Sequence, residues 1–315
     1  MADGCEQQKN GMEKFEVHVL GCGSALPTTR HYPSAQVISL REKLFMVDCG
    51  EGAQLQLRRS RLRFSRLNHI FITHLHGDHC FGLPGLVSTF ALLGRTADMH
   101  VYGPVDLEKV MQPLLNYFCS SIPFTVHFHT VDTNVGGKVY EDRSVLVEAF
   151  PLQHRKPCVG YLFREKPSLP HIKRDMIDFL GIPHFAINDI KAGGGWTTTD
   201  GVFYPHERLV TPAEPPRSYA YCSDTRFVPE LAETLRGVDL LFHEATFAET
   251  DAARAAETLH STARQAATLA KMAEVRRLLI GHFSARYEDE NVLLKEAQSV
   301  FADTFLAREG LCVAL

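Results

Sequence analysis

Hydrophobic residues along this chain of 315 residues fall into short runs that alternate with amphipathic stretches. Runs of β-branched and aromatic residues bounded by Gly, Pro or charge predict strands. We expect these strands at Phe15–Leu20, Gln36–Leu40, Leu44–Asp48, Ile70–Thr73, His100–Tyr102, Phe124–His129, Val145–Phe150, Val159–Phe163, Tyr219–Cys222, Val238–His243, Arg277–Gly281 and Leu311–Ala314. Apolar residues that recur every three or four positions predict helices. We expect these helices at Glu51–Arg59, Gly82–Leu93, Val105–Phe118, Pro229–Leu235, Ser261–Ala273 and Asn291–Phe305.

The predicted elements indicate an α/β protein with two sheets. A single parallel sheet would use fewer strands, and helices occur in both halves, so the pattern favours two packed sheets with helices outside them. The segment Pro167–Pro216 differs from its surroundings, because it holds seven of the sixteen prolines, a run of three glycines and the only tryptophan. A segment of this length would be unusually long for a loop without secondary structure. We expect an inserted protruding element or a linker, and the helical pattern of Ile172–Leu180 favours the insertion.

Composition narrows the class of protein. The chain is 45% hydrophobic and 22% charged, as ordinary globular domains are, and its formal net charge is −4. Its apolar runs are shorter than the ~20 residues of a membrane helix, so no membrane partner is expected. The stretch Met1–Lys14 lacks the apolar run that a secretory signal contains, and we interpret it as a short tail. Eight cysteines without paired spacing predict reduced thiols and a cytoplasmic protein.

The strongest chemical signal is the segment Thr73–His79, which follows the apolar run Ile70–Ile72 directly. Residues i and i+2 of an extended chain point to one side, so His74 and His76 can bind one ion. Gly77 permits a sharp turn, which can direct the next two side chains, Asp78 and His79, at a second ion. Imidazole and carboxylate suit Zn²⁺, and also Fe or Mn.

The segment His74–His79 resembles the HxHxDH signature of the metallo-β-lactamase superfamily, whose fold is a four-layer αββα sandwich. Residues just past three later strand ends match the further ligands of that superfamily: His154, Asp224 and His282. The resemblance implies two Zn²⁺ per chain and no organic cofactor. It also implies that one zinc is held by His74, His76 and His154, the other by Asp78, His79 and His282, and that Asp224 bridges them.

Within the superfamily, the chain from Phe15 to Tyr287 resembles ribonuclease Z. Four further segments carry this resemblance: Asp48–Gln54 (DCGEGAQ), His243–Phe247 (HEATF), His260–Ala266 (HSTARQA) and His282–Tyr287 (HFSARY). It implies an endoribonuclease that cuts the 3′ trailer from precursor tRNA with a metal-activated water and leaves a 3′-hydroxyl. It further implies a homodimer and a single domain, residues 15–315, from which residues 167–216 protrude as the tRNA-binding arm.

The resemblance also implies catalytic roles. Asp78 resembles the proton acceptor of the family, and it would orient the nucleophilic water and take its proton only as charge leaves, because a carboxylate bound to a cation is a weak base. His260 would protonate the leaving 3′ oxygen or bind the scissile phosphate, and Glu244 would orient His260. The structural alternative for His260 is a histidine at a helix start packed beside Ser261.

Some features leave alternatives open. The family commonly has a basic loop near its N-terminus, whereas the corresponding loop, residues 27–32, keeps only Arg30 as a firmly cationic residue. A second group of cations fits a solvated face, a subunit contact or RNA binding equally well: Arg58, Arg59, Arg61, Arg63 and Arg66. His127 and His129 favour a structural role. The competing functions are a small-molecule phosphodiesterase or arylsulfatase-like hydrolase on the same fold, and a di-iron redox protein.

Overall fold

The computed structural model describes residues 14–26 and 28–315, so all but Lys14 of the predicted N-terminal tail lies outside the described residues. Each of the twelve predicted strands is present, with ends shifted by three residues or fewer. The first sheet has seven strands in the order β18 (Cys312–Ala314), β1 (Phe15–Gly21), β2 (Ala35–Leu40), β3 (Lys43–Val47), β4 (Leu67–Phe71), β5 (Met99–Gly103) and β6 (Val126–Thr130). The second sheet also has seven, in the order β17 (Thr304–Leu306), β16 (Arg277–Gly281), β15 (Leu240–Glu244), β14 (Ser218–Cys222), β9 (Cys158–Glu165), β8 (Val145–Leu152) and β7 (Gly137–Glu141).

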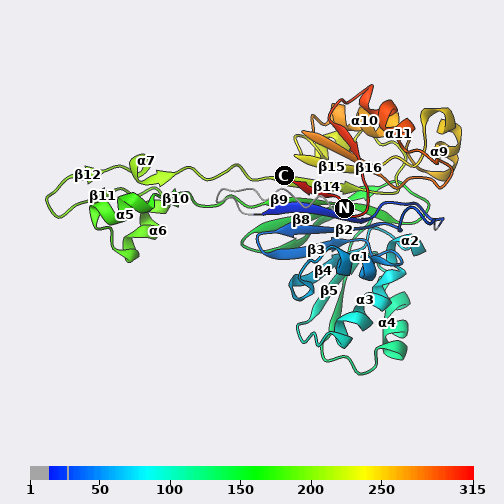
Figure 1. Ribbon diagram of the computed structural model, residues 1–315, viewed down its shortest axis with the longest axis horizontal. Coiled ribbons are helices and arrows are strands. Elements are labelled where there is room, and N and C mark those ends of the chain that lie inside the picture. The colour runs from blue at the N-terminus through cyan, green and yellow to red at the C-terminus, as the bar shows by residue number, and fades with distance from the viewer. Residues whose placement is uncertain (1–13, 27) are drawn as a thin grey trace. The chain divides into compact units, whose positions relative to one another are not determined.

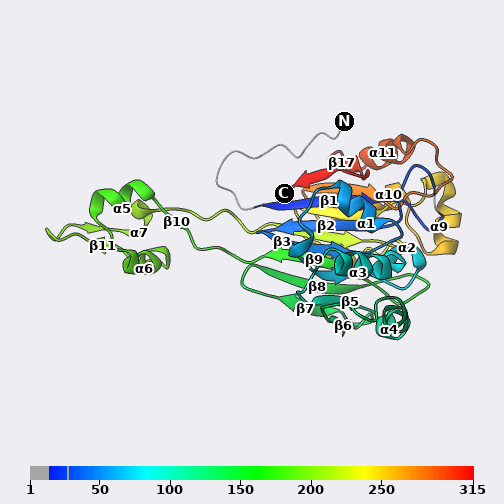
Figure 2. The ribbon, with the colours of Figure 1, turned by 60° about the horizontal axis from the view of Figure 1, so that its bottom comes forward.

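Helices cover the outer face of each sheet, which gives the expected αββα layers (Figure 1, Figure 2). The first sheet is covered by α1 (Ala53–Arg59), α3 (Gly82–Leu92) and α4 (Leu107–Phe118), and the second by α10 (Ala263–Met272) and α11 (Asn291–Gln298). Helix α8 (Leu231–Thr234) lies against α10. The apolar faces of α1, α3 and α4 pack on the sheet in one cluster that includes Leu57, Leu86 and Met111. The α/β sandwich predicted from the sequence is therefore confirmed.

Strand direction places the loops that matter for function. In the first sheet β3, β4, β5 and β6 are mutually parallel, and in the second β14, β15, β16 and β17 are parallel. Parallel neighbours end at the same edge of their sheet, so the loops that follow β4, β14 and β16 emerge at sheet edges where their side chains can converge.

The C-terminal part of the chain differs from the prediction. The helix expected over Asn291–Phe305 is wrong beyond Gln298, because Thr304–Leu306 is strand β17 and pairs with β16. Pairing with a neighbouring strand outweighs the local helical pattern there. Outside residues 165–216, the helices α2 (Gly77–Cys80) and α9 (Ala252–Thr258) and the strand β7 were also not predicted. Strand β7 is an edge strand whose side chains are largely exposed, so it lacks the apolar alternation that marks a half-buried strand.

The inserted segment forms a compact unit of its own, made of residues 142–145 and 165–216. A small core holds it together, and this core consists of Ile182, Ala186, Ile190, Leu209 and Val210. Its elements are β10 (His171–Ile172), α5 (Arg174–Leu180), α6 (Ile187–Lys191), β11 (Trp196–Thr197), β12 (Phe203–Tyr204), α7 (His206–Leu209) and β13 (Val210–Thr211). We call residues 165–216 the arm. A helix forms where the pattern of Ile172–Leu180 predicted one.

None of the helices in the described part of the chain has the length and hydropathy of a membrane span.

A close backbone contact fixes the start of α3 against the turn after β3. Gly82 donates its amide to the carbonyl of Cys49 at 2.8 Å. A Cβ at Gly82 would lie 2.1 Å from the carbonyl oxygen of Gly50 and 2.9 Å from that of Cys49. Backbone cannot move aside as the end of a side chain can, so glycine is required here.

We therefore expect Gly82→Ala to lower the melting temperature by several °C, since forced overpacking costs about 1–3 kcal/mol. Gly85→Ala in the same helix is the matched control. Its Cβ would meet the movable amide of Gln54 at 2.4 Å, so its effect should be much smaller. Thermal unfolding followed by circular dichroism measures both, and equal melting temperatures for the two variants would contradict the backbone argument.

Candidate functional site

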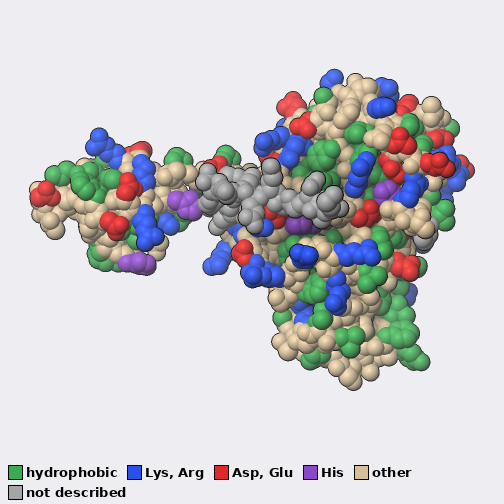
Figure 3. Space-filling model, viewed as in Figure 1, with side chains coloured by type: hydrophobic (Ala, Val, Ile, Leu, Met, Phe, Trp, Pro, Cys, Tyr) green, Lys and Arg blue, Asp and Glu red, His purple; other side chains and the backbone are tan. Residues whose placement is uncertain are grey.

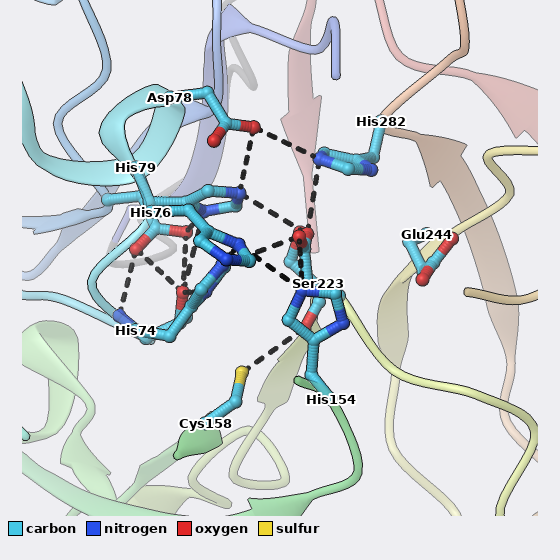
Figure 4. A network of polar contacts seen from close by, with 12 residues as sticks. His74, His76, Asp78, His79, His154, Cys158, Ser223, Glu244 and His282 are labelled. Carbon is cyan, nitrogen blue, oxygen red and sulfur yellow. Dashed lines mark hydrogen bonds and ion pairs between the residues drawn. The ribbon is translucent and has the colours of Figure 1, made fainter. Parts of the chain in front are cut away.

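The seven predicted metal ligands converge from strand ends of both sheets. His74 and His76 follow β4, and Asp78 and His79 lie in α2. The ligands from the second sheet follow strands β8, β14 and β16, in the order His154, Asp224 and His282. Figure 4 shows the labelled imidazole rings and the Asp78 carboxylate pointing inward at a common centre.

The first ligand group consists of His74, His76, His154 and Asp224, whose ligand atoms all lie within 4.8 Å of one another. Nδ1 of His76 is 2.9 Å from Nε2 of His74 and 3.2 Å from Nε2 of His154. Oδ2 of Asp224 is 3.4 Å from Nε2 of His74 and 3.6 Å from Nε2 of His154. Three nitrogens and one oxygen therefore face one point.

The second ligand group consists of Asp78, His79 and His282. Oδ1 of Asp224 is 3.2 Å from Nε2 of His79 and 3.1 Å from Nε2 of His282. Oδ2 of Asp78 lies 3.4 and 3.5 Å from the same two nitrogens. Asp224 thus presents one oxygen to each group, as a bridging carboxylate would.

Hydrogen bonds behind the rings set their tautomers. Nδ1 of His79 lies 2.7 Å from a carboxylate oxygen of Asp48, and Nδ1 of His154 lies 3.1 Å from the carbonyl of Leu259. Because these partners can only accept, each Nδ1 carries a proton. In a neutral ring the Nε2 lone pair then faces the centre. Such outer partners are typical of metal-ligating histidines.

Unpartnered polar atoms support a metal at the second group. Oδ2 of Asp78, Nε2 of His79 and Nε2 of His282 are buried and have no hydrogen-bond partner within the described residues. Buried polar atoms are rarely left unpaired in native structures. A cation would satisfy all three atoms, so the residues present fit a metal ion, and imidazole with carboxylate is a set that suits zinc.

The protonation states also fit metal binding. Burial lowers the pKa of His76 to about 4, and burial lowers the pKa of His74 and His154 as well. Burial alone would raise the pKa of Asp224, but the charges of His282, His79 and His74 hold that pKa well below its usual range. Neutral imidazoles and an ionised carboxylate are the forms that bind metals.

His79 behaves differently in the absence of a cation. Burial alone would lower its pKa, yet the carboxylates of Asp224, Asp48 and Asp78 raise the pKa well above its usual value. A proton on His79 therefore occupies the place that a bound cation would take, and metal binding should release it.

The structure brings His260 and Glu244 together beside the ligands. Nδ1 of His260 is 2.7 Å from a carboxylate oxygen of Glu244, which is fully buried. Burial would lower the pKa of His260, but the charge and hydrogen bond of Glu244 raise it to about 9. The ring of His260 also stacks on that of His282 at 5.3 Å. His260 precedes the N-cap of α10, Thr262, by two residues, so it lies at a helix start, as the structural alternative expected, and also beside the ligand groups.

The sequence did not predict the supporting roles of two residues, Asp48 and Thr246. Asp48 is fully buried and accepts hydrogen bonds from the amide and hydroxyl of Thr73, from Tyr221 and from His79. Thr246 donates to Glu244 at 2.6 Å and lies 2.9 Å from Nδ1 of His282. In the sequence, Asp48 stands at the end of a predicted strand and begins the DCGEGAQ segment, but nothing in that segment identifies the side chains that it contacts.

The remaining candidates lie outside the ligand groups. Nε2 of His129 is 3.0 Å from Nδ1 of His100, and His127 pairs with Asp98; neither His127 nor His129 belongs to any potential metal-binding group of the described residues. The guanidinium of Arg30 donates to the carbonyls of Tyr287 and Glu288, both at 2.6 Å.

Comparison with known proteins gives a consistent result. The family described as "Anti-Pycsar protein Apyc1" matches residues 15–163, and the one described as "Beta-lactamase superfamily domain" matches residues 209–283. A curated protein of Bacteroides fragilis named Ribonuclease Z is 62% identical over 304 residues, which are 96% of this chain and 100% of that protein. Ribonuclease Z of Bacteroides thetaiotaomicron is 60% identical over 304 residues, which are 96% of both chains.

A solved structure agrees with these sequence relatives. The short form of human tRNase Z superposes with a TM-score of 0.69 at 27% identity, covering 95% of this chain and 98% of that one. The relatives match the chain over nearly its whole length, including the candidate site. The chain therefore belongs to the ribonuclease Z family.

Proposed function

We propose that the protein is a metal-dependent endoribonuclease that removes the 3′ trailer from precursor tRNA and leaves a 3′-hydroxyl. The observation that carries this proposal is the pairing of two ligand groups, bridged by Asp224, with a protonated histidine held by Glu244 at their edge. This arrangement supplies positive charge and an acid at one phosphodiester. The near-complete match to proteins named Ribonuclease Z supports RNA as the substrate.

We infer two zinc ions per chain. His74, His76 and His154 would hold one, Asp78, His79 and His282 the other, and Asp224 would contribute one oxygen to each. When bound, such a pair lowers the pKa of a water and neutralises the oxyanions of an in-line phosphoryl displacement.

The protein side chains then orient the reactants and move protons. Asp78 lies at the edge of the second group, where it orients the attacking water and accepts its proton as charge leaves the phosphate. His260, held by Glu244, donates a proton to the departing 3′ oxygen. Thr246 and the amide of Thr225 fix Glu244, so the acid is positioned before the substrate arrives.

The arm is the proposed contact to tRNA. It carries four Lys or Arg against six Asp or Glu from Pro167 to Pro216, so a general positive field cannot explain RNA binding. Three phenylalanines of the arm are exposed instead, to 76%, 79% and 63%: Phe179, Phe185 and Phe203. Figure 3 shows hydrophobic and basic side chains together on the visible face of this unit. Aromatic rings of this kind can stack on exposed bases.

Two further features belong to the same proposal. Helix α4 leaves an apolar face exposed, formed by Val110, Leu114, Tyr117 and Phe118, and this face supports a homodimer. The seven described cysteines are free, which suits the reducing cytoplasm that we propose as the location.

The bridge predicts the effect of one substitution. Asp224→Ala should lose both bound metal and activity, because its carboxylate serves both groups. Elemental analysis of the purified variant measures the metal. Asp178→Ala, an exposed aspartate of the arm, is the control. An unchanged content of two metals per chain would remove Asp224 from the bridge.

The acid predicts a pH dependence. His260→Ala should keep its metal and slow single-turnover cleavage on the order of 10²–10⁴-fold. In the parent, protonated His260 persists until the pH rises through about 9. In Glu244→Gln the charge that raises this pKa is gone while burial still lowers it, so the basic limb of the pH–rate profile should move to lower pH.

A rate for His260→Ala within about threefold of the parent would restore the structural reading of that residue. A basic limb that stays in place in Glu244→Gln, with metal content unchanged, would remove Glu244 from its positioning role. Measuring metal content in all three proteins keeps loss of metal separate from loss of the acid.

Removal of the arm distinguishes between two functions, a tRNA enzyme and a small-molecule hydrolase on the same fold. We expect replacement of Pro170–Pro212 by a short Gly/Ser linker to abolish tight binding of precursor tRNA and to preserve hydrolysis of a small chromogenic phosphodiester. The arm has its own core, so its removal leaves the sandwich core intact. Parent-like tRNA affinity of the folded truncated protein, measured by a gel-shift titration, would favour the small-molecule function.

A further inference from the structure

A hollow of about 410 Å³ opens directly beside the two ligand groups. His76 and Asp78, one from each group, line it together with the backbone of Gly77. Its other walls are Ala25, Pro33, Glu51 and Phe81. A phosphodiester at the metal ligands therefore has a mainly apolar recess as its neighbour, which none of the roles assigned above uses.

Phe81 is a preformed stacking surface. Its side chain is 70% exposed although it lies next to buried ligands. A Cβ on Gly77 would lie 2.3 to 2.7 Å from three atoms of this ring, so the ring rests on bare backbone. One part of the ring is thus supported by the chain while the rest is open. An exposed aromatic ring held in this way suits a flat partner, such as a nucleobase.

The negative charge on the wall of the hollow favours the base of a nucleotide over its phosphate. Glu51 is exposed on the wall, and its carboxylate repels a phosphate but accepts hydrogen bonds from base amino groups. A strand whose scissile phosphate sits at the metal ligands can therefore place the adjoining base here, with its next phosphate beyond Glu51.

A cation on the side of Glu51 is Arg59. Gly52, next to Glu51 in the chain, lies against the ring of Tyr32, since a Cβ there would be 2.5 Å from it. The guanidinium of Arg59 lies over the same ring at 5.9 Å and within 3.3 Å of its hydroxyl. In the described part of the chain, no carboxylate forms an ion pair with Arg59, so its charge is available.

Arg30 is committed elsewhere. Its guanidinium binds the carbonyls of Tyr287 and Glu288 and lies 3.3 Å from the carboxylate of Glu290. It therefore holds the loop that follows His282 and has little capacity left for RNA.

We propose that the hollow at Phe81 binds the base of an unpaired nucleotide flanking the scissile phosphate, and that Arg59, seated on Tyr32, contacts the adjoining phosphate in place of Arg30. This inference rests on the proposed RNA-cleaving function. It assigns a role to one arginine of the 58–66 cluster and makes Phe81 a determinant of how the cleavage site is positioned.

The test of the base site is a coupling measurement. Precursor tRNAs with a single abasic nucleotide at each position around the cut are cleaved by the parent and by Phe81→Ala under single-turnover conditions. Losing one base–aromatic stack should slow the intact substrate roughly ten- to hundredfold. At one position next to the cut, the abasic substrate should already be slow and Phe81→Ala should slow it no further. Phe81→Tyr should retain the parent rate.

Controls separate this inference from the proposed function. Leu92→Ala removes another exposed apolar side chain, of 85% exposure, and should behave as the parent. Leu92→Ala should also hydrolyse the chromogenic phosphodiester as the parent does, and every variant should hold metal as the parent does. If Phe81→Ala slows every abasic substrate equally, or leaves the intact substrate unchanged, the base site is wrong. If the parent itself does not cleave precursor tRNA, the proposed function fails instead.

The phosphate contact is tested by salt dependence. Each phosphate contact contributes about 0.7 to the slope of log affinity against log salt for single strands. Arg59→Gln should lower this slope by about that amount, and Arg63→Gln, an exposed member of the same cluster, should leave it unchanged. A lower slope in Arg30→Gln together with an unchanged slope in Arg59→Gln would overturn the assignment.

Discussion

The buried carboxylate of Asp224 is the constraint on which the rest of the site depends. It is 2% exposed, and its two oxygens face histidines supplied by both sheets. An isolated charge at such a depth costs several kcal/mol unless cations surround it. The sandwich must therefore keep the ends of β4, β8, β14 and β16 in fixed relation, because each of them brings a histidine or Asp224 itself to this cluster. The packing of the two sheets therefore also determines how well the ligands can bind metal.

The backbone at the strand ends carries part of that constraint. Asp48, Asp224 and His282 all have positive φ, at 56°, 51° and 60°, although none of them is glycine. This conformation is uncommon for residues other than glycine, although Asp and His adopt it more often than most, and it persists where the surroundings enforce it. Each of the three turns sharply off its strand and directs its side chain into the site. The hydrogen bonds and charge pairs that these side chains make in the site offset the cost of the backbone conformation.

The sequence was most informative where residues that share a function lie close together along the chain. The segment His74–His79 predicts ligands because neighbouring residues share one ion, and the apolar runs predict the strands that carry them. The supporting roles of Asp48 and Thr246 could not be predicted, since the histidines that they contact are brought close only by folding. Arg30 shows the same limit: as a charge in a loop it suggested RNA, whereas the fold gives it backbone carbonyls. Strand β17 needed its neighbour β16 to form.

The arm has a topological consequence. Strands β9 and β14, which flank it in sequence, are antiparallel neighbours in the sheet, with Phe163 opposite Tyr219. The arm is thus an enlarged hairpin connection, and the sheet constrains only its two ends. The entropy of closing such a connection grows only with the logarithm of its length. Evolution can therefore lengthen, shorten or exchange the arm at little cost to the sandwich, so substrate range can diverge while the chemistry stays the same.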